Sequence, residues 1–411
     1  MSASSIKWYG ERDDVTKETE IIIEQMSKEQ RKSIVYLGGF NLPNANAAAQ
    51  RVVANAKLLR ELGYEVMLVG LSADNDNINK TFLYEGFQCI NLKYPHSAIE
   101  WLKYLVSYRQ YMQFVKKMNP FAVIAYNHPS IAMQRLTEFC RRNGIKMLAD
   151  CTEWYEPHGS WFFRQIKGWD SKKRMTEVPC NMDGVIAISK FLYDFYIKRG
   201  VKTLLLPPLV DKQEGKWHQT TGQEDGKIRL VFAGSIDRGY KERLDVIVEA
   251  LSRIEKKLSS AFVLDVIGIN EEQFRNSFTE WKDKTLPSFV RFHGRIDHEE
   301  AIKMLIKSDF QIFVRDNSLS NTAGFPTKFV ETISARSLVL TNPSSNIGDY
   351  LFEGVNGYTL DIKNIDLLTD SLMEPLSLNM ESIKEKRRKM NADVFDYRNY
   401  VSSMEHFINN L

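Results

Sequence analysis

Short apolar runs alternate with longer amphipathic stretches along most of this chain. In the first half, an apolar run at residues 33–37 leads through a Gly-Gly turn into small apolar residues at helical spacing that end at Gly63, and a second run follows at residues 65–70. The second half repeats this order at residues 228–233, 243–257 and 262–268. Each repeat predicts a strand, a helix and a strand. Such units predict parallel sheets with helices on both faces.

Further short apolar runs extend both predicted sheets. They lie at residues 122–126, 146–149, 184–188 and 203–206 in the first half, and at residues 290–293, 310–314 and 338–341 in the second. Their near-continuous apolar character is typical of strands that are buried on both faces. The predicted fold class is therefore α/β, with two doubly wound, Rossmann-like domains.

A polar stretch without periodicity separates the two halves at residues 207–226, and we interpret it as an interdomain linker. The predicted organisation is a polar N-terminal extension over residues 1–30, an N-terminal domain over 31–206 and a C-terminal domain over 227–394. Residues 395–411 are predicted to form a helix, but their periodicity does not indicate on which domain it packs.

The composition is that of a cytosolic globular protein. With 411 residues, 43% of them hydrophobic, the chain is long enough for two or three domains with sizeable cores. Its 55 basic and 52 acidic residues give a net charge of +3, which argues against nucleic acid as a partner. The four cysteines are widely spaced, so neither a zinc site nor a disulfide framework is predicted. No apolar run reaches transmembrane length or resembles a signal peptide, so we expect a cytoplasmic protein that reaches a membrane only from its inner face.

The sequence GFPTKFVE at residues 324–331 has the pattern of a nucleotide-binding turn. It follows an apolar run directly, and it predicts a helix that begins near Gly324, Phe325, Pro326 and Thr327. The unpaired N–H groups at a helix start can bind phosphate oxygens. Glu331, deeper in the helix, is placed to accept hydrogen bonds from ribose hydroxyls. The alternative is an ordinary turn with a surface glutamate.

From about residue 33 to its end the chain resembles the GT-B glycosyltransferases of the large retaining group 1, or family 4-like, type, which includes sucrose synthases and bacterial surface-polysaccharide enzymes. The resemblance rests on the segments GGFNLPNANAAAQRV, VIAYNHPS, LADCTEWYEP, MDGVIAISKF, FAGSIDRGYKERLDVIVEAL, VRFHGRIDHEEAI and GFPTKFVETISARSLVLTNPSSNIGDYLFEGVNGYTLD. It implies two domains that face each other across a deep cleft. The C-terminal domain would hold the nucleotide-sugar donor and the N-terminal domain the acceptor, in agreement with the usual ligand position in such sheets.

The resemblance assigns roles to residues of the C-terminal half. Lys241, which follows the Gly234 turn, corresponds to the family's diphosphate-binding lysine, and Arg238 is a second candidate cation. His293 and Arg295 fall where the family's loop contacts the nucleobase.

The family signature has two glutamates separated by seven residues. Glu331 matches the second, whose implied role is to bind the ribose, but the first position is Ala323. The first glutamate contacts hydroxyls of the donor sugar in the family, so other groups must recognise the sugar here. Nearby candidates are Asp316, Asn317, Asn321 and Thr322. Otherwise the protein is weakly active, or binds a nucleotide sugar without turning it over.

The resemblance also implies a retaining reaction that needs no metal or other cofactor. In such enzymes the acceptor hydroxyl attacks from the face that the diphosphate leaves, so Lys241, Arg238 and the helix start near Gly324 would stabilise the leaving group. An Asp-x-Asp pair at Asp74 and Asp76, the type that binds manganese in the other major glycosyltransferase fold, lies in a polar run. We interpret it as part of a solvated loop.

Residues that follow predicted strands of the N-terminal half are further candidates. The Gly38-Gly39 turn lets the backbone approach the donor diphosphate, and it lacks the GxGxxG pattern of nicotinamide-dependent enzymes. His128 corresponds to a family histidine near the donor sugar and acceptor, which makes it a candidate catalytic residue; a structural turn residue is the alternative. Asp150 and Glu153 are candidates for binding acceptor hydroxyls or acting as a base, and their alternative is a structural role at a strand end.

Two stretches, at residues 101–117 and 161–174, mix aromatic and basic residues in a way that suits an anionic membrane surface. The spacing in the first favours an amphipathic packing helix. The second is the better candidate for contact with a membrane or with a lipid-diphosphate acceptor.

Together with the resemblance, these features predict a retaining, metal-independent glycosyltransferase. It would move a hexosyl unit from a nucleotide diphosphate sugar, with UDP as the expected nucleotide, to a saccharide or lipid-linked saccharide. The expected process is bacterial surface polysaccharide or lipopolysaccharide biosynthesis. One alternative is a non-catalytic nucleotide-sugar-binding subunit, motivated by Ala323. Another is a GT-B-fold epimerase of UDP-amino sugars, whose pattern of carboxylates and histidines we do not find in the sequence.

Overall fold

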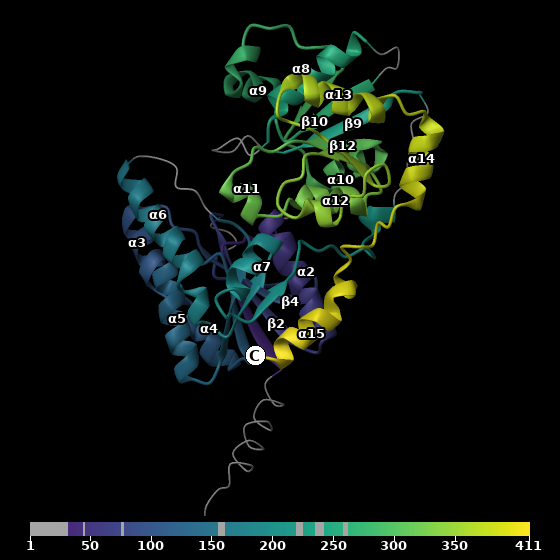
Figure 1. The fold of residues 1–411 in the computed structure, drawn as a ribbon. Helices are drawn as coiled ribbons and strands as arrows, with labels where there is room; N and C mark the ends of the chain where they lie inside the picture. Colours follow the sequence, from purple (N-terminus) through teal and green to yellow (C-terminus); the bar gives the residue numbers. More distant parts are fainter. Residues whose placement is uncertain are drawn as a thin grey trace, which may run out of the picture.

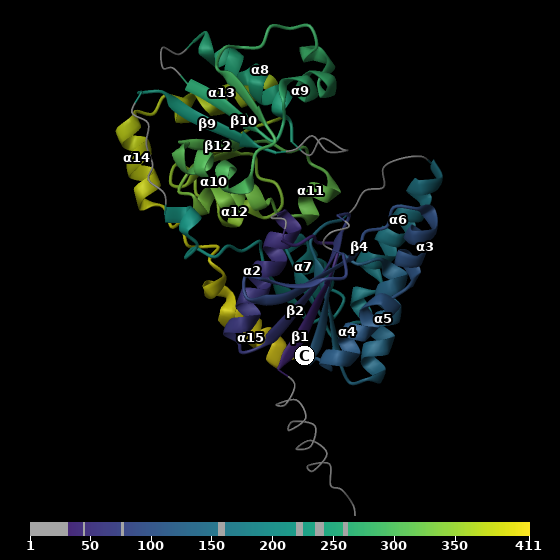
Figure 2. The ribbon, with the colours of Figure 1, turned by 180° about the vertical axis from the view of Figure 1, so that it is seen from behind.

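The computed structural model describes residues 32–43, 46–74, 78–154, 161–218, 225–234, 242–257 and 262–411. Figure 1 shows two α/β domains, one above the other, each with a central sheet between helices, and Figure 2 gives the reverse view. The predicted pair of doubly wound, Rossmann-like domains is confirmed. The predicted extension over residues 1–30 lies outside the described residues. None of the helices described is both long and apolar enough to cross a membrane.

The N-terminal domain is built on an eight-stranded sheet with the order β3-β4-β2-β1-β5-β6-β7-β8. Its strands are β1 (Ser33–Gly38), β2 (Glu65–Ser72), β3 (Thr81–Tyr84), β4 (Phe87–Lys93), β5 (Ala122–Tyr126), β6 (Lys146–Cys151), β7 (Gly184–Ala187) and β8 (Thr203–Leu205). All neighbours pair in parallel except β3 and β4, which are antiparallel. The strand order reverses between β1 and β5, and such a switch point is the usual ligand position in α/β sheets.

Helices cover both faces of this sheet (Figure 1). They are α2 (Ala47–Glu61), α3 (Ala98–Val106), α4 (Arg109–Met118), α5 (Ser130–Arg142), α6 (Trp161–Thr176) and α7 (Lys190–Ile197). The Asn46 side chain caps α2 by accepting a 2.8 Å hydrogen bond from the Ala49 N–H. The helix ends before Gly63, whose φ of +82° suits glycine.

The C-terminal domain has an all-parallel six-stranded sheet with the order β11-β10-β9-β12-β13-β14. Its strands are β9 (Ile228–Ala233), β10 (Phe262–Ile267), β11 (Val290–Gly294), β12 (Phe310–Phe313), β13 (Leu338–Thr341) and β14 (Gly357–Thr359). Its helices are α8 (Leu244–Glu255), α9 (Glu271–Ser277), α10 (His298–Lys307), α11 (Leu319–Ala323), α12 (Thr327–Ser334), α13 (Ile365–Leu376) and α14 (Met380–Lys389). The strand order reverses between β9 and β12, so these two strands flank the switch point.

The last helix, α15 (Val401–Asn409), returns to the N-terminal domain and packs against α2 and β8 (Figure 1). Its Phe407 is buried against β7, where a Cβ added to Gly184 would lie only 2.7 Å from the Phe407 Cζ. The sequence did not indicate this location, because it depends on a surface of the other domain.

Two chain segments cross between the domains, and they are hydrogen-bonded to each other. The Val210 N–H donates a 3.0 Å hydrogen bond to the Phe395 carbonyl, and the Tyr397 N–H donates one of 3.0 Å to the Val210 carbonyl. Trp217, also in the predicted linker, is buried against Ile302 and Leu305 of α10. The described part of the linker is therefore a packed segment rather than a loose tether.

Candidate functional site

Residues that follow the carboxyl ends of the two sheets meet at the domain boundary. Ser189, the N-cap residue of α7, donates a 2.7 Å hydrogen bond to the carbonyl of Ala323 at the end of α11. The Lys190 N–H donates one of 3.1 Å to Asn346 Oδ1 in the C-terminal domain. Figures 1 and 2 both show α11 and α12 on the side of their domain that faces α7 and α2.

The glycine turn of the N-terminal domain is shaped by close backbone packing. Gly38 has a φ of +147°, and a Cβ at this position would lie 2.1 Å from the Tyr126 carbonyl oxygen. No other residue fits there without moving β5. Gly39 is exposed, with no atom within 4 Å of an added Cβ, so a ligand can approach its backbone closely.

The glycine turn of the C-terminal domain follows β9 at the switch point. The Gly234 N–H donates a 3.0 Å hydrogen bond to the Ile267 carbonyl, and an added Cβ on Gly268, whose φ is +89°, would lie 2.1 Å from the Gly234 carbonyl oxygen. On its other side Gly234 faces Lys328, whose Nζ would be 3.2 Å from an added Cβ.

The helix α12 begins at Thr327, with Pro326 as its N-cap residue, and no side chain caps its first turn. The Phe325 ring belongs to the core, because it contacts the rings of Tyr350 and Phe395 at centroid distances of 5.7 and 6.1 Å. Of the predicted turn, Gly324 and Thr327 are half-buried, whereas Phe325 and Pro326 are buried. Phe325 can therefore contact a ligand only through its backbone.

Glu331, the predicted ribose ligand, contacts His298, which in turn contacts a helix of the other domain. Its Oε1 is 2.9 Å from Nε2 of His298 at the start of α10. The same ring nitrogen lies 2.8 Å from Nε2 of Gln50 on α2, in the other domain. Glu331 and His298 side chains are 18% and 27% exposed, so this junction of three helices is accessible to a ligand.

Ala323, at the first signature position, is fully buried, and its carbonyl is bonded to Ser189 as described. Two of the residues proposed to recognise the sugar in place of the missing glutamate already make hydrogen bonds within their own segment. Asn321 Nδ2 donates to the Asp316 carbonyl at 2.8 Å, and the Thr322 hydroxyl donates to the Ser318 carbonyl at 2.9 Å. The Asp316 carboxylate is 58% exposed and lies 3.7 Å from Arg243. Among the candidates this carboxylate is the one best placed to meet sugar hydroxyls.

The predicted nucleobase residues lie at the end of β11. His293 Nε2 is 2.7 Å from Asp265 Oδ1, which fixes the ring orientation, and Arg295 is exposed. The predicted cations Arg238 and Lys241 lie outside the described residues, as does Asp76. Their roles therefore stay predictions, as does that of His293 and Arg295.

His128 is fully buried against α3 and α4. Its ring makes edge-to-face contacts with Tyr104 and Tyr111, at centroid distances of 5.5 and 5.0 Å. Neither ring nitrogen has a hydrogen-bond partner within the described ranges, and burial lowers the pKa of His128 to about 3. A neutral imidazole enclosed by aromatic rings favours the structural alternative, and the catalytic role stays a prediction.

Asp150 is enclosed in a buried ion pair. Its Oδ1 is 2.7 Å from Nη2 of Arg51 on α2, and its Oδ2 accepts a hydrogen bond from the Tyr36 hydroxyl. The side chains of Arg51 and Asp150 are 3% and 0% exposed. This environment leaves no free carboxylate for an acceptor, and it matches the structural alternative. Glu153, which follows β6, is half-buried, and its acceptor role stays a prediction.

Solved structures of other proteins have the same two-domain arrangement. Sucrose-phosphate synthase from Thermosynechococcus elongatus is 14% identical with a TM-score of 0.68, covering 92% of this chain and 98% of that one. HepE of Anabaena, in complex with UDP, is 11% identical with a TM-score of 0.64, covering 92% and 100%. The lipopolysaccharide outer core galactosyltransferase WaaB is 14% identical with a TM-score of 0.59, covering 91% and 99%. At such low identity these likenesses establish the fold alone.

The C-terminal domain supplies the decisive comparison. Residues 213–394, which include the Gly234 turn, α12 and Glu331, match the family described as glycosyl transferases group 1. The protein has the GT-B fold, and its C-terminal domain is a group 1 glycosyltransferase domain. No curated protein sequence matches the chain.

Three charged residues of this glycosyltransferase were missed by the sequence analysis. Lys328 lies inside the GFPTKFVE motif itself, and its Nζ is 3.1 Å from Oε1 of Glu242. The same oxygen is 2.7 Å from Nη2 of Arg315. A basic residue at a predicted helix start can be recognised from the sequence. The contact of this lysine with Glu242 cannot, because it joins distant parts of the chain.

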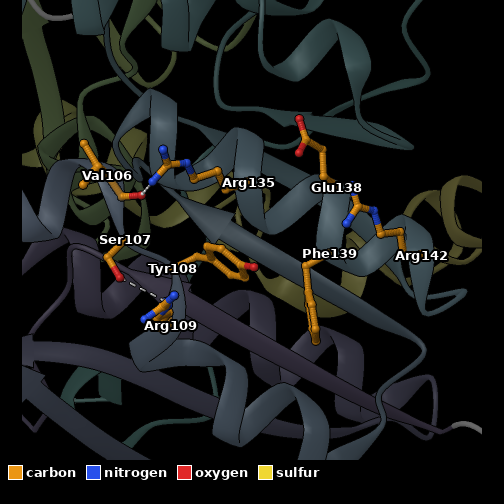
Figure 3. A pocket seen from close by; sticks show the side chains of 8 residues that line it. All are labelled: Val106, Ser107, Tyr108, Arg109, Arg135, Glu138, Phe139 and Arg142. Atoms are coloured by element: carbon orange, nitrogen blue, oxygen red, sulfur yellow. Dashed lines mark hydrogen bonds between the residues drawn. The ribbon is translucent and has the colours of Figure 1, made fainter.

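A separate hollow of about 470 Å³ lies on the outside of the N-terminal domain of the glycosyltransferase, between the α3–α4 turn and α5 (Figure 3). Eight residues line it: Val106, Ser107, Tyr108, Arg109, Arg135, Glu138, Phe139 and Arg142. None of them belongs to the predicted donor or acceptor residues. Arg135 is held in place by donating a 2.7 Å hydrogen bond to the Val106 carbonyl.

Proposed function

We propose that this glycosyltransferase moves a hexosyl unit from a UDP-sugar to a saccharide or lipid-linked saccharide, with retention and without a metal ion. The proposed process is the assembly of a bacterial surface polysaccharide or lipopolysaccharide on the cytoplasmic face of the membrane. One observation carries the proposal: the uncapped start of α12 and Glu331, one turn further on, lie at the domain boundary beside Gln50 of the other domain.

One neighbour supports a uridine nucleotide as the donor. HepE of Anabaena was solved in complexes with UDP and with UDP-glucose. Its fold matches this chain over the full length of both domains, so the same boundary is available here for a ligand of that kind. WaaB, described as a lipopolysaccharide outer core galactosyltransferase, supports the proposed type of process in the same limited way.

The proposed reaction breaks the bond between the anomeric carbon and the diphosphate oxygen, while the acceptor oxygen forms a new bond on the same face. The acceptor proton leaves with the departing phosphate oxygen. Negative charge grows on the diphosphate, so the protein's contribution is fixed positive charge and N–H groups aimed at the leaving group. The start of α12, the Gly234 backbone and the predicted cations Arg238 and Lys241 would supply them.

Thermal unfolding in the presence of nucleotides tests the proposal. UDP at 100 times its Kd is expected to stabilise the protein by about 2.7 kcal/mol, and ADP and GDP much less. Slow release of free sugar from the preferred UDP-sugar would then support turnover. Binding without any turnover, even with crude acceptor lipid, would instead support the non-catalytic subunit, and no response to any of the three nucleotides would overturn the proposed donor.

The membrane part of the proposal is supported by exposed apolar side chains on α3 and α6, which lie side by side in Figures 1 and 2. Ile99 and Leu102 of α3 are 68% and 62% exposed, and Trp169 of α6 is 53% exposed. Lys173 Nζ lies 5.3 Å from the Trp169 ring. The helix α4 buries Tyr111, Phe114 and Val115, as expected of a packing helix, whereas every residue of α3 is at least partly exposed. Apolar and cationic groups together suit an anionic bilayer.

Vesicle flotation checks this contact. We expect the protein to float with vesicles that contain anionic phosphatidylglycerol and less with pure phosphatidylcholine. The double variant Leu102→Glu with Trp169→Glu should stay unbound. Leu83→Glu, on an exposed leucine of β3, is the matched control. Flotation that ignores lipid charge, or that survives the double substitution, would contradict the proposed surface.

A further inference from the structure

The switch point of the C-terminal sheet contains two buried cations and one buried carboxylate, while the half-buried Glu331 acts on one of the cations from further away. The cations Lys328 and Arg315 share the single carboxylate of Glu242, at 3.1 and 2.7 Å. The three side chains are only 13%, 11% and 9% exposed. Lys328 Nζ is buried and pairs with Glu242, and no other described residue accepts a hydrogen bond from it.

The protonation of this cluster follows from its geometry. Burial alone would raise the pKa of Glu242, but Lys328 and Arg315 together lower it to about 2, so the carboxylate is ionised. Burial and the nearby charge of Arg315 lower the pKa of Lys328, and the carboxylates of Glu242 and Glu331 offset this only in part. Arg315 makes the shorter, two-pronged contact through Nε and Nη2. Lys328 is therefore the cation whose charge is least neutralised, and a buried charge in that position favours an additional anion.

The place of Lys328 indicates where that anion would lie. Its Nζ is 5.3 and 5.5 Å from the rings of Phe232 and Phe313, which stand at the ends of the two strands that flank the switch point. The added Cβ that would come within 3.2 Å of Nζ belongs to Gly234, so a group that approaches the Gly234 backbone also reaches the ammonium. Lys328 is also the second residue of α12, whose first turn no side chain caps.

We propose that Lys328 Nζ binds the diphosphate of the nucleotide-sugar donor, and that Glu242 and Arg315 position it. This assignment rests on the proposed function. It deepens that function by naming a cation, among the described residues, that would bind the leaving group. The diphosphate supplies the negative charge that the cluster lacks. As the bond to the sugar breaks, the added charge on the diphosphate strengthens this contact.

A purely structural lysine would behave differently when its charge is removed. Lys328→Met keeps the length of the side chain and leaves Glu242 and Arg315 as a matched pair. We expect the free variant to melt no lower than the parent, because an incompletely paired buried cation has gone. Loss of one hydrogen bond to a charged group should weaken UDP binding by about 10- to 100-fold. Binding of uridine, which lacks phosphates, should change by less than about twofold.

The experiment measures the affinities of UDP and uridine, and the rate of UDP-sugar hydrolysis, for the parent, Lys328→Met, Lys328→Arg and the control Lys303→Met on α10. Lys328→Arg keeps the charge and should keep most of the preference for UDP over uridine. The control Lys303→Met should match the parent in all three measurements. If a folded Lys328→Met variant binds UDP with an affinity within twofold of that of the parent, the assignment of Lys328 is overturned, but the proposed function is not. If that variant does not fold, Lys328→Gln decides by the same comparison. A parent that binds none of UDP, ADP and GDP would overturn the proposed function and the assignment with it.

Discussion

Replacement of Asp150 by alanine is expected to lower the free energy of unfolding by ~3–5 kcal/mol, because it leaves the Arg51 guanidinium buried without its partner. Arg51 would keep only the carbonyls of Leu206 and Pro207, which it contacts at 3.0 and 3.2 Å. Since Arg51 joins α2 to the end of β6 and to the start of the linker, the loss should be seen in the unfolding of the whole N-terminal domain. Denaturant titration followed by circular dichroism measures it.

Two further variants separate this structural role from the predicted acceptor role. Asp194→Ala removes an exposed partner of Lys190 and should change stability by less than about 1 kcal/mol. The double variant Arg51→Met with Asp150→Leu should regain most of the lost stability, because the unpaired charge has been removed as well. If Asp150→Ala folds as stably as the parent but loses transferase activity, the carboxylate acts on the acceptor and our structural interpretation is wrong.

Replacement of Glu331 by alanine is expected to lower UDP affinity by about 10- to 100-fold, since the ribose hydroxyls would lose the carboxylate that accepts their hydrogen bonds. Its oxygen also holds His298 at 2.9 Å, so that the ring would lose its orientation toward Gln50. The loss should be the same for UDP and uridine, because both carry the ribose. Calorimetric titration of the two ligands makes this comparison.

Equal losses for UDP and uridine distinguish Glu331 from Lys328, whose substitution should affect UDP alone. Glu300→Ala, on an exposed glutamate of α10 in the same part of the domain, is the control and should leave both affinities unchanged. His298→Gln tests whether the imidazole contributes separately from the carboxylate. Unaltered uridine binding by Glu331→Ala would contradict the assigned ribose contact.

The sequence predicts most of the fold because buried parallel strands have continuous apolar runs. The bounds of β5, β9 and β13 agree with the apolar runs that predicted them. The strands β3 and β4 were missed, as was the short β14. In β3 exposed and half-buried residues alternate, and β4 is interrupted by polar side chains such as Asn91, so neither has the continuous apolar pattern of a central strand.

The site was less predictable, because its geometry depends on contacts between distant segments. The position of Glu331 on a helix near the domain boundary was inferred from the motif, but its contact with His298 joins residues 33 positions apart, and the contact of His298 with Gln50 joins residues 248 positions apart. Asp150 had the right residue type and strand-end position for a base. Only the structure reveals that its carboxylate is paired with Arg51, 99 positions earlier in the chain.

The paired crossing segments determine how the two halves of the molecule can move. Because Val210 is bonded to both Phe395 and Tyr397, the outgoing and returning chains form a single double-stranded hinge on one side of the molecule. Rotation of one domain about this pair would break the contacts Ser189–Ala323 and Lys190–Asn346 across the boundary but would leave the paired segments intact, whereas sliding or twisting one half past the other would break the hydrogen bonds of the pair as well. A rotation about the paired segments is therefore the motion that we expect to widen the boundary without disturbing either sheet.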